Sequence, residues 1–267
     1  MLATPAITPW PALPLAGQVV LVTGGGNGIG RGIAQAVLGA GGQVAIADID
    51  TAALQACMHD WQAGERAMAV PMDVTDGNSV AAALARVIAH FGRLDGLVNN
   101  AGLADPHLPP LDQASWDDWQ AGLSSLHGAF LCSRAALPAL RASGRGAVVN
   151  IASTRAHQSE PHSEAYAAAK GGLLAFSHAL AISEGAAVRV NAITPGWVET
   201  ADWQAPPRNA LPQHRPIDHA QHPAGRIGLP QDIGALAVFL LSGLSGFVTG
   251  HEFIADGGIS RRMLYAG

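Results

Sequence analysis

Short apolar runs separated by helical stretches are the feature that most constrains this chain. The run VVLVTG at 19–24 carries no charge and leads through a glycine-rich turn into a helical stretch at about 29–38. Uninterrupted apolar strands are typical of a parallel sheet covered on both faces, and parallel neighbours need crossover helices. We therefore predict an α/β fold, a doubly wound (Rossmann) parallel sheet of about seven strands flanked by helices on both faces, in a single domain. Further strands are expected at 43–48, 67–74, 94–100, 147–153, 188–194 and 252–258, and further helices at 51–62, 78–91, 113–142, 163–182 and 230–241.

The length and the start of the chain agree with one domain. Its 267 residues are 49% hydrophobic, which suits one large core. Residues 1–15 contain four prolines and no basic residue, unlike the basic start and helical apolar segment of a signal peptide. We expect 1–15 to be an N-terminal extension and 16–267 to form the domain.

Charge and composition exclude several classes of partner. The net charge of −5 and the pI near 6.1 argue against a phosphate-binding surface, so we expect no nucleic acid. No apolar run reaches membrane-spanning length without glycine, proline or charge, so we expect no membrane association. Cys57 and Cys132 form no CxxC motif, which indicates reduced thiols and a cytoplasmic location.

Three histidines, His214, His219 and His222, lie close together in the stretch 196–225. The stretch is rich in proline and has no clear periodicity. These features favour a mobile loop over a zinc site, and we expect no metal.

The turn TGGGNGIG at 23–30 lies between the first strand and the first helix. Glycines let the backbone bend sharply and approach a pyrophosphate, and the helix N-terminus offers free N–H groups. Glycine-rich runs also occur in ordinary turns, but the strand–turn–helix setting favours a dinucleotide site. The residues expected to contact the phosphates are Gly24, Asn27, Gly28, Ile29 and Gly30.

Asp48 ends the second strand. A carboxylate there can accept hydrogen bonds from the adenosine ribose hydroxyls and would repel a 2′-phosphate. No Arg or Lys lies between Asn27 and Gly30 or directly after Asp48, so we expect NAD rather than NADP. Alternatively, Asp48 or Asp50 caps the next helix; Asp50 is the better cap, which leaves Asp48 free for the ribose.

Two further strand ends carry polar residues. Asp73 ends the third strand and is either a cofactor residue or a helix N-cap, a role that Thr75 or Asp76 could equally fill. The run NNAG at 99–102 ends the fourth strand, where small residues leave room for a ring or a sugar, although a turn alone would explain it.

Tyr166 and Lys170 are four residues apart in a helical stretch, so their side chains lie on one face. The chain has fourteen arginines but Lys170 is its single lysine, and its other tyrosine is Tyr265. Chance would place one lysine four residues after a tyrosine on the order of one time in a hundred. The spacing therefore indicates a functional pair, although a packed tyrosine and a solvated lysine would be the simpler interpretation.

The chemistry of the pair explains its composition. A phenol has a pKa near 10, and a nearby ammonium stabilises the phenolate and lowers that pKa toward neutrality. Tyr166 could then exchange a proton with a substrate oxygen. Ser153 ends the fifth strand and can hydrogen-bond the same oxygen.

Together these residues resemble the short-chain dehydrogenase/reductase family, classical type, over about residues 15–260. The matching pieces are TGGGNGIG (23–30), Asp48, Asp73-Val74, NNAG (99–102), Ser153 in NIAS, YAAAK (166–170), Arg189-Val190-Asn191, PGWVET (195–200), RIGLPQDI (226–233) and ADGG (255–258).

The resemblance implies an enzyme that moves a hydride between a nicotinamide and a CH–OH group. Tyr166 would be the general acid/base, Lys170 would bind the nicotinamide ribose and lower the tyrosine pKa, and Ser153 would orient the substrate. The stretch after Thr200 would form a substrate lid, at about 197–225. Members are usually homotetramers, with the two long helices and the last strand at the contacts, and a dimer is the alternative. The cofactor residues would be Gly24, Asn27, Gly28, Ile29, Gly30, Asp48, Ile49, Asp73, Val74, Asn100, Ala101, Gly102, Tyr166, Lys170, Pro195, Gly196, Val198 and Thr200.

One position departs from the family pattern. The family usually has an asparagine in the long fourth helix that helps to hold a water in a proton relay, and Ser125 stands there. Ser125 could hold a water itself, or His127 could contribute, so Ser125 is a fourth catalytic candidate. We expect turnover to survive and leave open whether it is slow.

The substrate is less constrained. Arg155 could meet a substrate carboxylate or stay paired with Glu160. The mixture of polar residues and tryptophan around Ser153 favours polyols, sugars or hydroxy acids, although most of these residues could be loop surface. The tail Arg261–Tyr265 either crosses to a partner subunit or frays. The pocket candidates are Ala152, Arg155, His157, Glu160, His162, Trp197 and Trp203.

Three functions are compatible with these residues. The first is an NAD-dependent dehydrogenase of secondary alcohols. The second is a 3-oxoacyl-thioester reductase, disfavoured by Asp48 and by the lack of a basic patch for an acyl carrier. The third is a catalytically weak NAD-binding sensor, which only the departure at Ser125 supports.

Overall fold

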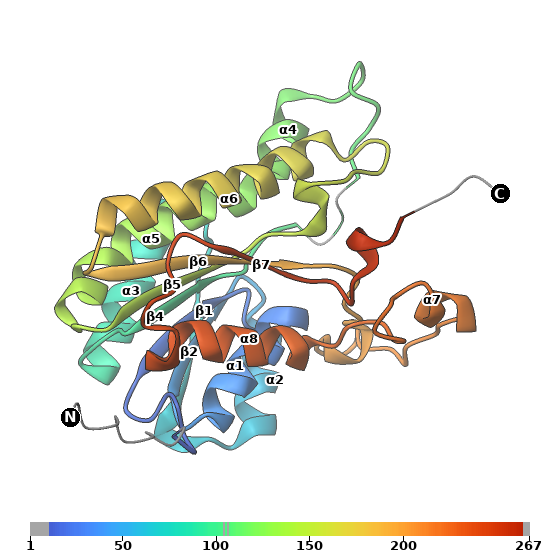
Figure 1. Cartoon of the computed structure of the whole chain (residues 1–267). Helices are drawn as coiled ribbons and strands as arrows, with labels where there is room; N and C mark the ends of the chain where they lie inside the picture. The colour runs from blue at the N-terminus through green and yellow to red at the C-terminus, as the bar shows by residue number, and fades with distance from the viewer. Residues whose placement is uncertain (1–10, 104, 106, 264–267) are drawn as a thin grey trace, which may run out of the picture.

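The computed structural model describes residues 11–103, 105 and 107–263 (Figure 1). Within these residues the chain forms a seven-stranded sheet in the order β3-β2-β1-β4-β5-β6-β7, and all neighbouring strands are parallel. The strands are β1 (Val19–Thr23), β2 (Gln43–Asp48), β3 (Ala67–Pro71), β4 (Gly96–Asn99), β5 (Gly146–Ile151), β6 (Val188–Pro195) and β7 (Glu252–Ala255). The α-helices are α1 (Gly28–Gly39), α2 (Thr51–Trp61), α3 (Gly77–Phe91), α4 (Trp116–Gly122), α5 (Ser124–Ala142), α6 (Glu164–Glu184), α7 (Pro216–Ala220) and α8 (Pro230–Leu241). Short 3-10 turns are η1 (Gly64–Arg66), η2 (Thr154–Ala156), η3 (Ala201–Trp203), η4 (Gly243–Ser245) and η5 (Ile259–Arg261).

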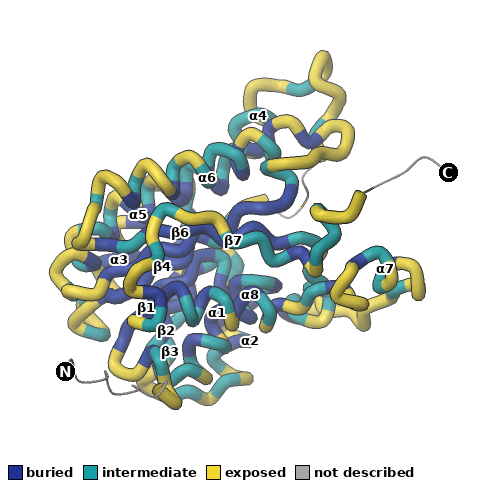
Figure 2. Tube along the Cα trace, viewed as in Figure 1, coloured by how far each residue is buried: buried dark blue, intermediate teal, exposed yellow. Residues whose placement is uncertain are grey.

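Helices cover both faces of the sheet (Figure 1). On one face Ile33 of α1 and Ile233 of α8 pack with the strands and with α2 into one apolar cluster. On the other face Val87 of α3 and Cys132 of α5 pack into a second cluster, which also takes in α6. The strands between them form the buried centre of the molecule (Figure 2). The predicted doubly wound parallel sheet is confirmed.

The long helix predicted at 113–142 is divided in the structure. A capping box starts α4, because the Ser115 side chain accepts the Asp118 N–H while Asp118 accepts the Ser115 N–H. Leu123 lies between α4 and α5, and α5 tolerates Pro138 in its interior. The local capping signal at Ser115 explains why the helix starts later than its apolar pattern suggests.

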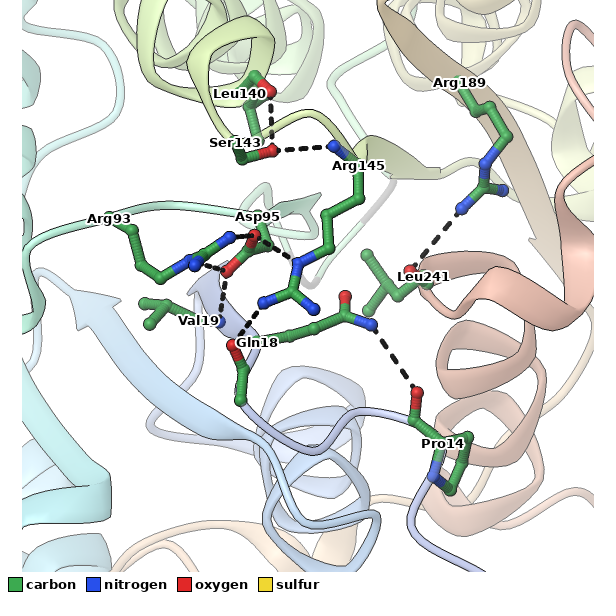
Figure 3. Close-up of polar contacts among 11 residues, drawn as sticks. Pro14, Gln18, Val19, Arg93, Asp95, Leu140, Ser143, Arg145, Arg189 and Leu241 are labelled. Carbon is green, nitrogen blue, oxygen red and sulfur yellow. Dashed lines mark hydrogen bonds and ion pairs between the residues drawn. The ribbon is translucent and has the colours of Figure 1, made fainter. Parts of the chain in front are cut away.

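A buried carboxylate holds together the amino ends of the central strands (Figure 3). Asp95, just before β4, accepts the N–H of Val19 at 2.8 Å. Arg93 donates to both Asp95 oxygens at 2.9 and 2.6 Å, and Arg145 donates to Oδ1 at 2.9 Å. Arg145, just before β5, also donates to the Gly17 carbonyl, just before β1. Asp95 and Arg145 together therefore connect the starts of β1, β4 and β5.

The stretch 196–225 is more ordered than the predicted mobile loop. It contains η3 and α7, and its histidine rings pack against each other and against Trp197. His222 is 2% exposed and its Nδ1 lies 2.9 Å from the Asp218 carbonyl. These edge-on and tilted ring contacts join residues that are not neighbours in the sequence, and no short-range periodicity reveals such contacts. Among the described residues, no group of three or more His, Cys, Asp or Glu is placed to hold a metal.

The ends of the chain are described only in part. Residues 1–10 of the predicted extension and 264–267 of the predicted tail lie outside the described residues. Leu15 is fully buried and its N–H donates to the Ala40 carbonyl at 3.1 Å, so the packed core includes the last residue of that extension. None of the helices in the described part of the chain is long and apolar enough to cross a membrane.

Candidate active site

A cleft of about 610 Å³ opens at the carboxyl ends of the strands from β1 to β6, where the strand order reverses between β1 and β4. Most of the predicted site residues line it. They are Gly24, Asn27, Gly28, Ile29, Asp48, Ile49, Asp73, Val74, Asn100, Ala101, Gly102, Ala152, Ser153, Arg155, Tyr166, Lys170, Pro195, Gly196, Val198 and Thr200. The predicted residues that do not line it are Gly30, Ser125, His157, Glu160, His162, Trp197 and Trp203.

The glycines of the turn allow a close approach of two backbone segments. Gly24 has a φ of +62°, which side chains disfavour, and a Cβ at Gly30 would lie 2.1 Å from the Gly24 carbonyl oxygen. Gly30 therefore acts through packing beneath the cleft. The first turn of α1 has no acidic residue, and Asn27 makes no side-chain cap bond to it. The N–H groups at the start of α1 thus fit an anionic pyrophosphate.

Asp48 and Asp50 have separate tasks. Asp50 caps α2 by accepting the Ala53 N–H at 3.0 Å, as the sequence suggested. Asp48 accepts the Gly26 N–H at 3.1 Å and the Asp50 N–H at 3.0 Å, and it still lines the cleft. These two bonds hold the carboxylate in place, while its remaining acceptor capacity suits ribose hydroxyls.

Asp73 does not cap α3. Its Oδ1 accepts the Thr75 N–H at 2.8 Å and the Thr75 hydroxyl at 2.7 Å, while Asp76 is the N-cap and accepts the Asn78 N–H. The helix N-cap is therefore Asp76, and the capping alternative for Asp73 is wrong. Asp73 instead orders a turn at the wall of the cleft.

The two asparagines of NNAG face different parts of the protein. Asn99 Nδ2 donates to Asn150 at 2.8 Å and to Ser133 at 3.1 Å inside the sheet. Asn100 Nδ2 donates to the carbonyls of Thr23 and Gly24 at 3.0 and 3.2 Å, which joins the β4 end to the glycine turn. The cleft is thus shaped by side-chain bonds between adjacent strand ends.

Ser153, Tyr166 and Lys170 meet in this cleft. Lys170 Nζ donates to the Ile151 carbonyl at 2.9 Å and lies 5.4 Å from the centre of the Tyr166 ring. The Ser153 hydroxyl accepts the Arg155 N–H at 3.2 Å, and Ser153 lowers the pKa of Tyr166. The end of β5 and one turn of α6 therefore bring the three predicted groups together.

Burial sets the protonation of this group. It raises the pKa of Tyr166, and the hydrogen bond to Ser153 and the charge of Arg155 offset that rise only in part. Burial also lowers the pKa of Lys170 to about 8. In the protein alone Tyr166 is a neutral hydroxyl at pH 7, and the lowering of its pKa by Lys170 stays a prediction for the cofactor-bound state.

Comparisons with known proteins agree with this geometry. A family model described as Enoyl-(Acyl carrier protein) reductase matches residues 24–260. The chain is 42% identical over 257 residues to an uncharacterized oxidoreductase of Thermotoga maritima, covering 94% of this chain and 99% of the relative. The chain belongs to the short-chain dehydrogenase/reductase family. Its alternation of strands and helices, its glycine turn and its Tyr–Lys spacing are those of an oxidoreductase of that family.

Two further likenesses extend over the whole domain. The chain is 36% identical over 244 residues to cis-4-hydroxycyclohexanecarboxylate dehydrogenase of Sinomonas cyclohexanicum, covering 90% of this chain and 96% of the relative. An apo SCOR enzyme from Clostridium thermocellum superposes with a TM-score of 0.83 at 37% identity, covering 94% and 96% of the two chains. Other relatives are named as dehydrogenases of L-fucose and D-threitol.

Ser125, at the position where the family usually has asparagine, lies behind the cleft rather than in it. It is 5% exposed, its hydroxyl has no hydrogen-bond partner among the described residues, and a Cβ on Gly102 would lie 2.8 Å from its Cβ. The neighbouring Ser124 lines the cleft, and its hydroxyl is also buried without a partner there. At the start of α5 the sequence indicated only the Ser125 hydroxyl as a candidate, whereas the structure shows two buried hydroxyls there without a partner among the described residues, those of Ser124 and Ser125.

Arg155 lines the cleft and pairs with Glu160, which is one of the two alternatives for this residue, while its contact with a substrate carboxylate stays a prediction. Ala152 also lines the cleft, whereas two other substrate candidates, His157 and Trp197, do not line it and make contacts elsewhere. His157 Nε2 lies 2.7 Å from Glu252 of β7, and Trp197 packs edge-on against His214 with ring centres 5.7 Å apart.

Two further residues of the stretch 196–225 line the cleft, Gln204 and Arg208, and neither was predicted from the sequence. The Ala205 N–H donates to Asn27 Oδ1 at 2.8 Å, and Arg208 pairs with Asp50. These contacts connect the stretch 196–225 to the glycine turn and to the loop after β2. No local pattern marks Arg208, because its partner lies 158 positions away in the chain.

Both cysteines are free and buried. Burial raises the pKa of Cys57 to about 11, and Arg31 lowers it less. Burial raises the pKa of Cys132 to about 12. Both thiols are therefore protonated at neutral pH and are poor nucleophiles.

Proposed function

We propose that this protein is an NAD(H)-dependent dehydrogenase that interconverts a polar secondary alcohol, such as a polyol, a sugar or a hydroxy acid, and its ketone. The observation that carries the proposal is the meeting of Ser153, Tyr166 and Lys170 in one cleft with a dinucleotide-type glycine turn. The relatives named for a hydroxy acid, L-fucose and D-threitol support this substrate range.

Each residue has a role in that reaction. A bound nicotinamide supplies the hydride acceptor for oxidation and the donor for reduction. Ser153 hydrogen-bonds the substrate oxygen and fixes its distance from Tyr166. In oxidation the Tyr166 oxygen takes the hydroxyl proton as the hydride leaves carbon; in reduction it returns that proton. Lys170 binds the nicotinamide ribose, and its charge favours the phenolate.

The rest of the cleft would hold the cofactor. The start of α1 would bind the pyrophosphate and Asp48 the adenosine ribose, which favours NAD over NADP. The nicotinamide amide would meet the backbone after β6. The residues assigned to these contacts are Gly24, Asn27, Gly28, Ile29, Asp48, Ile49, Asp73, Val74, Asn100, Ala101, Gly102, Pro195, Gly196, Val198 and Thr200.

Cofactor choice tests the assignment of Asp48. We expect the wild type to reduce NAD in preference to NADP with a panel of polyols, sugars and hydroxy acids. Asp48→Ser removes the charge that repels a 2′-phosphate and should raise the NADP-to-NAD ratio of kcat/KM by about 10-fold or more. Asp112→Ser is the control, because Asp112 is exposed and does not line the cleft.

A wild-type preference for NADP would contradict the role of Asp48. Activity confined to a 3-oxoacyl thioester in the same panel would favour the reductase alternative. NAD binding without hydride transfer to any compound would favour the sensor.

We also propose a cytoplasmic homotetramer, with a dimer as the alternative. The supporting features are the exposed apolar side chains Phe130 of α5 and Ile182 of α6, which are 51% and 82% exposed. Light scattering on the protein as it elutes from a size-exclusion column should give a molar mass of about four times the chain mass of 27.3 kDa. Ile182→Lys should shift the mass toward smaller species, and an unchanged monomer mass in both proteins would refute the assembly.

A further inference from the structure

Arg155 occupies a position defined by the catalytic serine. It lies in η2, two residues after Ser153, and its N–H donates to the Ser153 hydroxyl at 3.2 Å. Its side chain lines the same cleft as Tyr166 and Lys170. Burial raises the pKa of Tyr166, and the charge of Arg155 offsets part of that rise. A substrate whose oxygen meets Tyr166 therefore has a guanidinium beside it.

The protein satisfies only part of the hydrogen-bonding capacity of the Arg155 guanidinium. Arg93 holds Asp95, and Arg141 holds Glu184, with both Nε and Nη2, whereas Arg31 and Arg208 use Nη2 alone. Arg155 holds Glu160 with Nη2 alone, and its Nε is buried without a hydrogen-bond partner among the described residues. A planar carboxylate that takes Nε and Nη2 together would satisfy the unpaired donor.

The counter-ion of Arg155 is easily exchanged. The Glu160 side chain is 55% exposed, whereas that of Arg155 is 31% exposed. Exposed ion pairs contribute little stability, so a ligand can displace Glu160 at low cost. The other charged groups that face this pair are His107, with Nε2 3.5 Å from Glu160, and Asp105, which bonds His107 at 3.0 Å. Asp105 and Glu160 are both exposed acids. The cleft lining itself contains two acids, Asp48 and Asp73, and these accept backbone N–H groups of nearby loops.

We propose that Arg155 binds a carboxylate of the substrate, so that the enzyme selects secondary alcohols and ketones that carry a carboxylate in the same molecule. The proposal rests on the proposed function and narrows its substrate class. In the protein without substrate, Glu160 takes the place of that carboxylate.

The test compares acids with their esters. The probes are 4-hydroxycyclohexanecarboxylate and 3-hydroxybutyrate, each beside its methyl ester, with NAD as oxidant. We expect the wild type to prefer the acids, and Arg155→Met to lower the acid-to-ester ratio of kcat/KM by about 30-fold. The ratio cancels any effect of the lost charge on Tyr166, which acts on both compounds alike. Arg155→Lys should give an intermediate ratio, because it keeps the charge without the planar fork.

Two further variants sharpen the result. Glu160→Gln should lower KM for the acids and leave KM for the esters unchanged, because it removes the competing carboxylate. Arg86→Met, an exposed arginine of α3, is the matched control and should keep the wild-type ratio. An acid-to-ester ratio that is the same in Arg155→Met and the wild type would overturn the proposal.

Binding separates this inference from the proposed function. Calorimetry measures the affinity of the wild type and of Arg155→Met for the two hydroxy acids in the presence of NAD. A loss of about 10-fold or more in Arg155→Met supports the carboxylate site even if no compound is oxidised. Equal affinity of the two proteins overturns it, whether or not the wild type is an active dehydrogenase.

Discussion

Tyr166→Phe should lower kcat/KM for alcohol oxidation by about 1,000-fold or more while NAD still binds. The substitution removes one oxygen from the cleft and keeps the ring that lies beside Lys170. Without that oxygen no side chain in the described cleft lining can take the hydroxyl proton at the same place, because Ser153 is a far weaker base. Initial rates measure the loss of hydride transfer, and quenching of protein fluorescence by NADH measures the retained cofactor site.

The chain offers a matched control for this substitution. Tyr265 is its only other tyrosine, near the end of the sequence, and Tyr265→Phe should keep turnover within about twofold. Wild-type turnover in Tyr166→Phe would refute the proton-transfer role. A parallel loss of NADH binding would instead assign Tyr166 to cofactor binding.

Asp95→Asn should clearly lower the stability of the protein without touching the cleft. It leaves the two arginines and the β1 backbone around a neutral amide, in a place where the Asp95 side chain is 0% exposed. Losing hydrogen bonds to such a charged group costs about 2–3 kcal/mol, which for a chain of this length lowers Tm by roughly 4–12 °C. Thermal unfolding followed by circular dichroism measures the shift, and Asp60→Asn in the exposed pair with Arg31 should change the free energy of unfolding by under about 1 kcal/mol.

The stabilising effect of Asp95 depends on pH in a definite direction. Burial by itself raises the pKa of Asp95, but the bonds from the two arginines and from Val19 outweigh burial and lower it. A group with a lowered folded pKa stabilises the protein fully above its unfolded pKa of about 3.9, and the effect is lost as the pH falls through the folded pKa. The difference between wild type and Asp95→Asn should therefore be constant near neutral pH and shrink below about pH 4. A difference that grows on acidification would contradict this network.

Much of the fold followed from local patterns. Buried parallel strands must be apolar along their whole length, so runs such as 43–48 predicted β2 to the residue. The late start of the fourth helix was not predicted, because a single capping box at Ser115 decides it, and no side-chain cap marks the break at Leu123. The Asp95 network was not predicted either, since Asp95 and Val19 are 76 positions apart and neither belongs to a motif.

In the candidate site too, features with a fixed local spacing were predicted, whereas contacts between residues far apart in the sequence were not. The glycine turn, Asp48 and the Tyr166–Lys170 pair have fixed spacing along a strand end or a helix, so the sequence alone predicts that they meet. Arg208 lines the cleft because the stretch 196–225 folds back onto Asp50. The packing of Trp197 with His214 likewise depends on how that stretch folds back on itself.

The single lysine has a consequence for chemical labelling. Lys170 is 5% exposed and its ammonium is held by the Ile151 carbonyl, so amine-directed reagents meet no accessible side-chain amine in the folded protein. Dyes and affinity tags coupled through amines will attach at the terminal amine and leave the cleft unmodified. Acylation of Lys170 then reports on one event, the opening of the active site to solvent.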